Sequence, residues 1–347
     1  MKKQFETPEI KPIYTKESVV VVHDDAGLPS IMVKVENTAP SKELADPMFI
    51  VRGQEYREIY LSQFLNSTVE DRAYSLPFAD PRAFINMDEA IAACRAKGPK
   101  WHLLTVPEWN YIIRNTHAGI HGNTNFGNYH GNTDERGIRS DYGRTMTGTG
   151  PASWFHNGDK KTGIADVVGN VWKIIAGLRL RRGVLEYMEN NDAAAPDADL
   201  SFESQEFKPV LVNGYPVHIG LNDEGSLCIT TDEVDGYAAE ERKEVVVDFA
   251  EVPQILKDLG IVTDNMDSSE EWFAADAELD EAVLFGGGSY LNTSCAGPSA
   301  LNLNNPRSNA NANIGFFSAY PLSQTGKFTD FSQCMKGKGI YFRSDVS

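Results

Sequence analysis

Cysteines are the side chains of this 347-residue chain best suited to hold a soft metal ion or to act as nucleophiles. The four are Cys94, Cys228, Cys295 and Cys334, and no two of them form a C-x-x-C pair. Cysteines this widely spaced indicate neither a zinc site nor a disulfide framework. The cysteine pattern therefore predicts no metal centre.

Histidines cluster in the Gly- and Asn-rich stretch from His117 to His130. His117 and His121 stand four residues apart, a spacing that could face one metal ion on a helix. Gly119 and Gly122 argue against a continuous helix, and no Glu stands where a metalloprotease base belongs. Metal ligation is the alternative here, and we expect loop histidines in a segment that buttresses a binding surface.

Carboxylates are dense between Asp232 and Glu281, within a chain of formal net charge -17. The simplest interpretation is a solvated acidic face. No EF-hand spacing is present, so a structural calcium ion stays open and no cofactor is predicted.

The composition changes sharply between Leu284 and Tyr320. Seven Asn residues fall in the twenty-two positions from Asn292 to Asn313, mixed with Gly, Ser, Ala and Pro, which is typical of turns and loops. Lys, Glu, Gln, Met and Trp are absent from 286 to 317. That restricted set is reachable by changing the first two bases of an Asn codon such as AAC. Chance absence in a short loop is the alternative.

Three motifs in this segment resemble the variable region of diversity-generating retroelement variable proteins: Gly287 to Tyr290, Leu303 to Asn309, and Asn313 to Phe316. In that family an error-prone reverse transcriptase rewrites adenines of a template repeat. The altered residues are displayed on a C-type lectin fold. The resemblance implies a hypervariable ligand-binding surface.

Two further stretches resemble formylglycine-generating enzymes and their sulfatase-modifying-factor relatives. The run from Leu104 to Trp109 is similar to their leucine-proline-threonine-glutamate-tryptophan stretch, although Val106 and Pro107 depart from the usual order. The run from Gly163 to Lys173 is similar to their DxxGNVWEW signature, with Lys173 where Glu is usual. Physically, a tight turn at Gly169 and Asn170 would bury a tryptophan while Asn and Asp side chains satisfy backbone groups.

The resemblance divides the residues into two sets. The implied scaffold is Trp109, Asp166, Gly169, Asn170, Trp172, Gly287, Gly288, Ser289, Ala296, Gly297, Leu303, Asn304, Asn305, Pro306, Ser308, Asn309, Ile314, Gly315 and Phe316. The implied variable, ligand-binding residues are Tyr290, Leu291, Asn292, Thr293, Ser294, Cys295, Ser299, Ala300, Ala310, Ala312 and Phe317. Arg307 is left unassigned, because the family pattern often has Arg there.

Among the variable residues, Tyr290, Leu291 and Phe317 are the strongest candidates for ligand contact, with core positions as the alternative. The family pattern usually ends in Gly-Phe-Arg, and here Phe317 replaces that Arg. Either Phe317 is a diversified position, or the final strand is displaced to the run from Gly339 to Arg343 in the tail.

Two functional classes compete. An oxidase of the formylglycine-generating kind needs two thiolates for copper, yet Asn292 and Gly297 occupy the positions where the enzymes have cysteines. Cys295 is a lone thiol nearby. We therefore expect no catalytic residues and no enzyme activity, and favour a ligand-binding protein.

The remaining elements frame this surface in an α+β fold. Residues 1–45 are expected to form an N-terminal β-hairpin arm, from runs at 18–23 and 30–35, packed on the main domain or, by preference, on another subunit. Strands are expected at 48–52 and 58–61. Helices are expected at 86–97 and after Thr105, with a short strand before Thr105.

The lectin-like fold is expected to cover 46–178 and 279–320, split by a β-rich insertion at 179–278. Within the insertion we expect an exposed excursion at 186–199, an Asn-Gly hairpin within 209–219, a strand at 226–231 and a helix at 252–259. A tail follows at 321–347.

Charge and termini suggest the setting. The acidic balance argues against nucleic acid and an anionic membrane surface, and no apolar run suits membrane insertion. The first residues, MKKQFETPEIKPIY, carry no apolar signal segment, so synthesis in a bacterial cytoplasm is expected. The resemblance implies a phage or prophage receptor-binding tail protein, a host-surface protein or glycan as ligand, and a homotrimer. A bacterial surface adhesin is the variant within this class.

Overall fold

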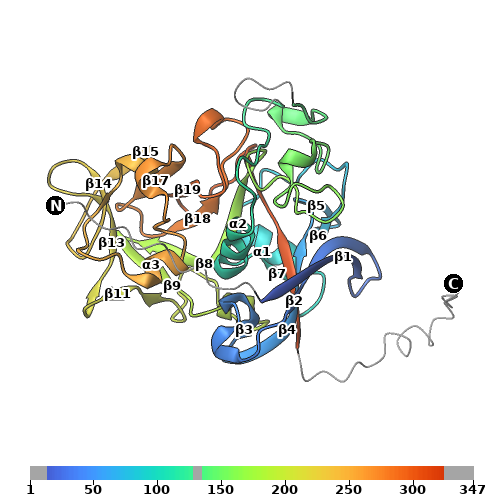
Figure 1. Ribbon diagram of the computed structural model, residues 1–347, viewed down its shortest axis with the longest axis horizontal. Coiled ribbons are helices and arrows are strands. Elements are labelled where there is room, and N and C mark those ends of the chain that lie inside the picture. The colour runs from blue at the N-terminus through green and yellow to red at the C-terminus, as the bar shows by residue number, and fades with distance from the viewer. Residues whose placement is uncertain (1–13, 128–134, 324–347) are drawn as a thin grey trace, which may run out of the picture.

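The computed structural model describes residues 14–127 and 135–323 (Figure 1). Strands dominate and helices are few, which is compatible with the α+β class. In the described part of the chain, no helix is both long and apolar enough to cross a membrane.

One sheet joins the N-terminal region to the last described strand. Within the described ranges it has six strands. In spatial order they are β1 (Thr15–His23), β2 (Pro29–Asn37), β4 (Gln54–Ser62), β21 (Ser318–Ser323) and β7 (His102–Leu103), with β3 (Ile50–Val51) paired to β4.

The N-terminal hairpin is confirmed, because β1 and β2 pair antiparallel around the turn at Asp24 to Gly27. The carboxylate of Asp24 accepts the backbone N–H groups of Ala26 and Leu28 at 3.0 and 2.8 Å, which fixes the turn. β2 also pairs with β4 from Met32 to Glu36. The hairpin therefore packs on the chain's own sheet through β2, which is the first of the two alternatives and not the preferred one.

The larger sheet curls like half a barrel. In the described residues it contains eleven strands. Their order is β15 (Tyr237–Glu241), β17 (Trp272–Asp276), β19 (Leu301–Asn305), β18 (Ala282–Gly286), β8 (Trp172–Arg181), β9 (Val184–Tyr187), β13 (His218–Leu221), β14 (Leu227–Thr230) and β16 (Val246–Val247), while β10 (Lys208–Pro209) pairs with β9 and β20 (Ile314–Phe316) with β8.

The centre of this sheet is β8, which is buried along its whole length except at Arg181. Neighbouring side chains on a strand point to opposite faces. Accordingly Ile174 and Ile175 belong to two different apolar cores, one on each face of the sheet. The strand is buried on both faces, and its two buried cations, Lys173 and Arg179, each have hydrogen-bond partners.

Three α-helices occur in the described residues: α1 (Met87–Arg95), α2 (Val106–Arg114) and α3 (Gln254–Asp258). The two long helices lie between the sheets in the view of Figure 1. Asn86 begins α1 with a capping box to Glu89, and Pro107 stands in the first turn of α2. Both helices and β7 before Thr105 confirm the expectations, because caps and prolines act locally.

The strand expected at 48–52 is wrong in part, because Pro47–Phe49 forms a 3-10 turn capped by Asp46 and the strand is confined to β3. The other short 3-10 turns lie at Lys42–Leu44, Asp141–Gly143, Ala152–Trp154, Asp192–Ala194, Arg242–Glu244, Met266–Ser268 and Thr293–Cys295. A small hairpin pairs β5 (Asn66–Val69) with β6 (Arg72–Ser75).

Residues 179–278 contribute strands to the same sheet as 279–320, since β17 pairs in parallel with β19. The predicted hairpin is confirmed as β11 (Leu211–Val212) and β12 (Tyr215–Pro216), and β14 and α3 also fall where expected. The expected exposed excursion at 186–199 is wrong, because Asn191 and Ala193 to Ala195 are buried.

After β20 the chain passes through Phe317 directly into β21, which pairs with β4 and β7. The chain therefore passes from the larger sheet to the six-stranded sheet at Phe317, without an Arg at this position. The alternative strand at 339–343 and the tail from 324 lie outside the described residues.

Candidate functional site

The loop from Gly287 to Ala300 joins β18 to β19 and is held at its start by the turn before β8. The backbone N–H of Gly169 donates to the carbonyl of Gly287 at 2.9 Å, and the N–H of Tyr290 donates to the carbonyl of Asn170 at 3.0 Å. Gly169 has a φ of +70°, and a Cβ there would stand 2.3 Å from the carbonyl oxygen of Asn123. Backbone hydrogen bonds therefore join the motif at 163–173 to the motif at 287–290.

Side chains of the same turn also form hydrogen bonds to backbone groups, as predicted. The Asn170 amide accepts from the Thr145 N–H at 2.9 Å and donates to the Thr145 carbonyl at 3.0 Å. The Asp166 carboxylate accepts the Gly148 N–H at 3.0 Å. Trp172 is buried. These residues satisfy backbone groups, which is a scaffold role.

Lys173 stands where the formylglycine-generating enzymes have Glu. It lies beneath the loop and is fully buried. Its ammonium donates to the carbonyl of Gly169 at 2.6 Å and lies 3.4 Å from that of Gly288. Burial lowers the pKa of Lys173 to about 7, while the nearby Asp166 carboxylate raises it. Burial likewise raises the pKa of Asp166 to about 6. The Lys173 ammonium thus connects the turn at Gly169 with the start of the loop at Gly288 inside the fold.

The histidine-rich stretch supports the loop from the side. The Thr293 N–H donates to the Thr124 carbonyl at 2.9 Å, and the Phe126 N–H donates to the Tyr290 carbonyl at 3.3 Å. The described part of this stretch, up to Gly127, therefore contacts the loop from 287 to 300, while its expected role in supporting a binding surface stays a prediction.

Two side chains from the 179–278 region grip the far end of the loop. Glu271 accepts the Ser299 N–H at 2.6 Å, and the Arg242 guanidinium donates to the Ser299 carbonyl at 2.7 Å. Arg242 is completely buried and also donates to the Ile261 carbonyl at 2.9 Å. Burial lowers the pKa of Arg242 to about 10 and raises that of Glu271. Sequence reasoning missed both residues, because nothing in their spacing relates them to Ser299.

Inside the loop, Asn292 acts as a brace. Its side-chain oxygen accepts the Ser289 N–H at 2.9 Å and the Ser289 hydroxyl at 2.8 Å. Ser289 is fully buried at this point. Asn292 therefore shapes the loop in this copy of the protein, although it stands in the predicted variable set.

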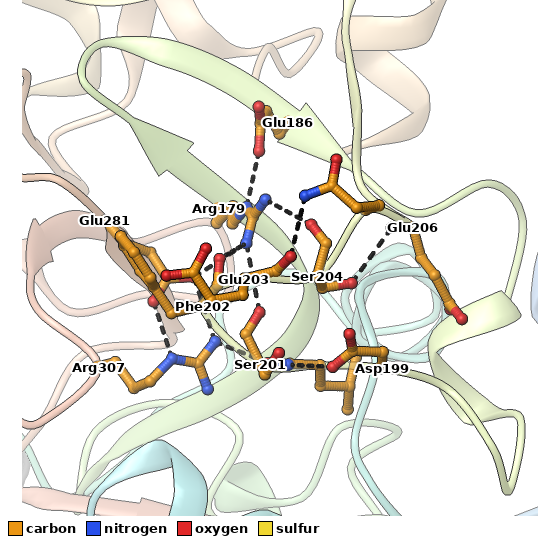
Figure 2. Close-up of polar contacts among 12 residues, drawn as sticks. Arg179, Glu186, Asp199, Ser201, Phe202, Glu203, Ser204, Glu206, Glu281 and Arg307 are labelled. Atoms are coloured by element: carbon orange, nitrogen blue, oxygen red, sulfur yellow. Dashed lines mark hydrogen bonds and ion pairs between the residues drawn. The ribbon is translucent and has the colours of Figure 1, made fainter.

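The second loop, residues 306–313, is fixed by Arg307. Its guanidinium donates to Glu281 at 2.8 Å, to Asp88 at 2.7 Å and to the Leu200 carbonyl at 2.7 Å. Arg179 also reaches Glu281, at 3.3 Å, so that both guanidinium groups converge on one buried carboxylate (Figure 2). Arg307, left unassigned above, is an anchor of the loop.

The asparagines of this loop bond to one another. The Asn305 amide donates to Asn302 at 2.7 Å, Asn309 donates to Asn305, and Asn311 donates to Asn309 at 2.7 Å. Beyond the amides, the Phe84 N–H donates to the Asn311 carbonyl at 3.0 Å. The Asn-rich composition thus builds a loop of defined shape.

The predicted variable residues separate by exposure into three groups. The exposed residues are Leu291, Thr293, Ser294 and Ala310; the half-buried ones are Asn292, Cys295, Ser299 and Ala312; the buried ones are Tyr290, Ala300 and Phe317. Most of the implied scaffold residues are buried, namely Trp109, Asp166, Gly169, Asn170, Trp172, Gly287, Gly288, Ser289, Gly297, Leu303, Ile314, Gly315 and Phe316. Ala296, Asn304, Asn305 and Asn309 are half-buried, and Pro306 and Ser308 are exposed.

Three residues predicted to contact a ligand, Tyr290, Ala300 and Phe317, are instead buried in this structure. Phe317 is only 1% exposed, lies in the main core, and its carbonyl accepts the Leu104 N–H at 3.1 Å. Tyr290 is 4% exposed and its ring packs on Phe126. Leu291, by contrast, is 50% exposed.

Three exposed aromatic side chains outside the variable segment also line this surface and were missed. Phe84, Phe126 and Tyr142 have φ values of 52°, 52° and 56°. A bulky residue in the left-handed region costs about 1–3 kcal/mol, and such residues concentrate at functional sites. Phe126 and Tyr142 each precede a glycine, which is the one local signal that could have marked them.

Metal-binding groups do not assemble in the described ranges, where no three His, Cys, Asp or Glu residues come together. The Nδ1 of His117 lies 3.0 Å from the Ala118 carbonyl, and the Nδ1 of His121 lies 2.8 Å from a Glu135 oxygen. Cys94 and Cys228 are buried. His130 and Cys334 lie outside the described residues.

Comparison of the chain with protein-family models and with curated proteins gives no match.

Proposed function

We propose that this chain is a non-catalytic ligand-binding protein whose two loops, 287–300 and 306–313, carry retroelement-diversified side chains. The observation that carries the proposal is the division of labour within the first loop. Its main chain is bonded to Gly169, Asn170, Thr124, Arg242 and Glu271, while Leu291, Thr293 and Ser294 face solvent. A recognition surface needs a fixed main chain and free side chains.

Three features favour binding over oxidase chemistry at this loop. A side chain at position 297, where the enzymes have cysteine, would place its Cβ 2.3 Å from the Glu271 carboxyl carbon. Asn292 at the other cysteine position is engaged with Ser289. Burial raises the pKa of the Cys295 thiol, which disfavours the thiolate that binds copper.

The fold we propose is a C-type lectin fold of the formylglycine-generating-enzyme branch, split by the 179–278 insertion. Pairing of β4 with β21 supports it, because this brings the start of the first half beside the end of the second. The hydrogen bond from the Gly169 N–H to the Gly287 carbonyl supports it as well, because the two residues belong to different halves of the proposed fold.

The biological setting rests on the family resemblance. We propose a phage or prophage receptor-binding tail protein, made in the bacterial cytoplasm and assembled on the particle as a homotrimer, with a protein or glycan of the host surface as ligand. A bacterial adhesin is the variant setting. No cofactor is needed for this role.

Sequencing of a few kilobases beside the gene tests diversification directly. We expect a near-copy of the segment encoding 286–317 that differs mainly at adenines, next to a reverse transcriptase gene. If both are absent, the variable-residue assignment fails. Copper binding and oxidase assays on the purified chain would then be informative, because tight Cu(I) binding would favour the enzyme instead.

A further inference from the structure

The exposed aromatic residues Phe84, Phe126 and Tyr142 form one continuous surface with the first loop. The rings of Phe84 and Tyr142 stand edge to face with centroids 5.1 Å apart, and those of Phe126 and Tyr290 lie 5.5 Å apart. Gly143 connects the two pairs, since a Cβ there would lie 2.6 Å from Phe126 and 3.0 Å from Tyr290. We call Phe84, Phe126 and Tyr142 the aromatic platform.

The platform is held outward by its surroundings. Phe84, Phe126 and Tyr142 are 47%, 46% and 64% exposed, and each has the left-handed backbone described above. Hydrogen bonds to backbone groups hold this geometry. The carbonyl of Phe126 accepts from the Arg139 guanidinium at 2.7 Å, and the N–H of Phe84 donates to the Asn311 carbonyl. Three large aromatic residues thus have a backbone conformation that L-residues avoid, although about half of each remains exposed to solvent.

The charge of the platform differs from that of the chain. Segments 78–84 and 136–144 contain four arginines (Arg82, Arg136, Arg139, Arg144) and two aspartates (Asp80, Asp141), so their formal charge is 4 − 2 = +2, with no Lys or Glu. The whole chain carries -17. Arg82, Arg136 and Arg139 are exposed, while Arg144 is buried and paired with Asp80 at 2.7 Å.

We propose that the aromatic platform docks a protein ligand whose surface offers apolar pockets rimmed by carboxylates. Tyr and Arg are enriched among the residues that contribute most of the binding energy in protein–protein interfaces. Charged residues are depleted in the buried centre of such interfaces. Arg139 is exposed and bonds the Phe126 carbonyl, so it places a positive charge beside the platform that suits an acidic partner surface. Small neutral ligands are usually bound in concave sites, whereas these rings project outward.

The platform lies outside the segment 286–317, so it stays the same when that segment varies. The inference rests on the proposed function in one respect, namely that the adjoining loops also contact the ligand. The platform would then supply a constant contact, and Leu291, Thr293 and Ser294 the part that distinguishes one ligand from another.

A defined probe tests the platform without knowledge of the natural ligand. A yeast-displayed library of ankyrin-repeat domains with randomised concave faces is selected against the full chain. Clones are then titrated with the double variant Phe84→Ser/Tyr142→Ser. We expect most independent clones to carry Asp or Glu around apolar positions and to bind this variant at least tenfold more weakly.

The matched control is Tyr215→Ser/Tyr237→Ser, which removes two rings that are 66% and 53% exposed in the 179–278 region. This variant should leave the affinity of the clones unchanged, and melting temperatures of both variants show whether they fold. Equal losses for both variants, or no loss for either, overturn the inference. Saturable binding on a glycan array that the platform variant abolishes overturns the assignment to a protein ligand.

A third variant separates this inference from the proposed function. Leu291→Glu/Ser294→Glu changes exposed residues of the loop only. If this variant loses clones that the platform variant keeps, the platform inference fails and the loop function stands. If the platform variant loses clones that the loop variant keeps, the platform inference stands and the proposed role of the loops in binding loses its support.

Discussion

Two strand connections of this molecule obtain their shapes in opposite ways. The turn between β11 and β12 is formed by Asn213 and Gly214, whose φ values of 53° and 86° suit a two-residue hairpin. The loop from 287 to 300 is held by main-chain bonds to residues distant in sequence. A turn that depends on its own residues restricts their types. A loop shaped from outside leaves its exposed residues free to vary.

The largest expected effect comes from removing an outside support. Arg242→Met should lower the free energy of unfolding by about 3–5 kcal/mol, because it leaves buried carbonyls of Ser299 and Ile261 unpaired near Glu271. Urea denaturation measures this. Arg182→Met is the control, since the Arg182–Asp280 pair is 77% and 65% exposed and should change stability by less than about 1 kcal/mol. Equal effects would remove the distinction between the two connections.

Lys173 should make the stability of the molecule depend on pH. Its pKa is about 7 in the folded chain and about 10.4 when unfolded, so the unfolded chain binds more protons between these values. The free energy of unfolding therefore rises as pH increases from about 7 to about 10, by up to ~1.4 kcal/mol per pH unit.

Lys173→Met should reduce that slope. Lys97 contributes in the same direction, because burial lowers its pKa to about 7 as well, so part of the slope should persist in the variant. Urea denaturation across this pH range gives both slopes. Identical slopes in the wild-type chain and the variant would contradict the buried, partly neutral state of Lys173 beneath the loop.

A smaller effect is expected in the self-shaped turn. Asn213→Ala should cost about 1 kcal/mol, because alanine is strained at positive φ, whereas Asn213→Gly should be tolerated. Chemical denaturation compares the two. A similar loss from both substitutions would show that the Asn side chain, and not the backbone, holds the turn.

The smallest effect should follow exchange of the exposed loop residues. Leu291→Ser, Thr293→Ala and Ser294→Tyr should each change the free energy of unfolding by less than about 0.5 kcal/mol, because these side chains are exposed. Asn292→Ala is the internal comparison, since it removes the brace on Ser289 and should cost more. Losses above 1 kcal/mol at Leu291 would contradict a loop shaped from outside.

Local features were predictable from the sequence because their causes are local. The cap at Asn86, Pro107 in the first turn of α2 and the Asn213–Gly214 turn act within a few residues, and all three are found in the structure. The turn at Gly169 and Asn170 was predictable from its own motif, whereas its hydrogen bond to Gly287 was not. Exposure of the variable residues was harder, because it depends on what packs against each one.

Distant partners account for what was missed. Tyr290 and Phe317 are buried by segments that no spacing connects to them, and Arg242 meets Ser299 only after the sheet has formed. The pairing of β17 with β19 also places the 179–278 region in the main sheet, which its β-rich composition could not reveal.

The position of β21 has a consequence for synthesis of the chain. This strand lies between β4 and β7, so the sheet begun by residues 15–62 stays incomplete until residues 318–323 have been made. At a synthesis rate of about 5–20 residues per second, that interval lasts on the order of tens of seconds. During it the edges of β4 and β7 are open to pairing with other chains. Nascent chains of this protein are therefore exposed to aggregation until residues 318–323 have been synthesised.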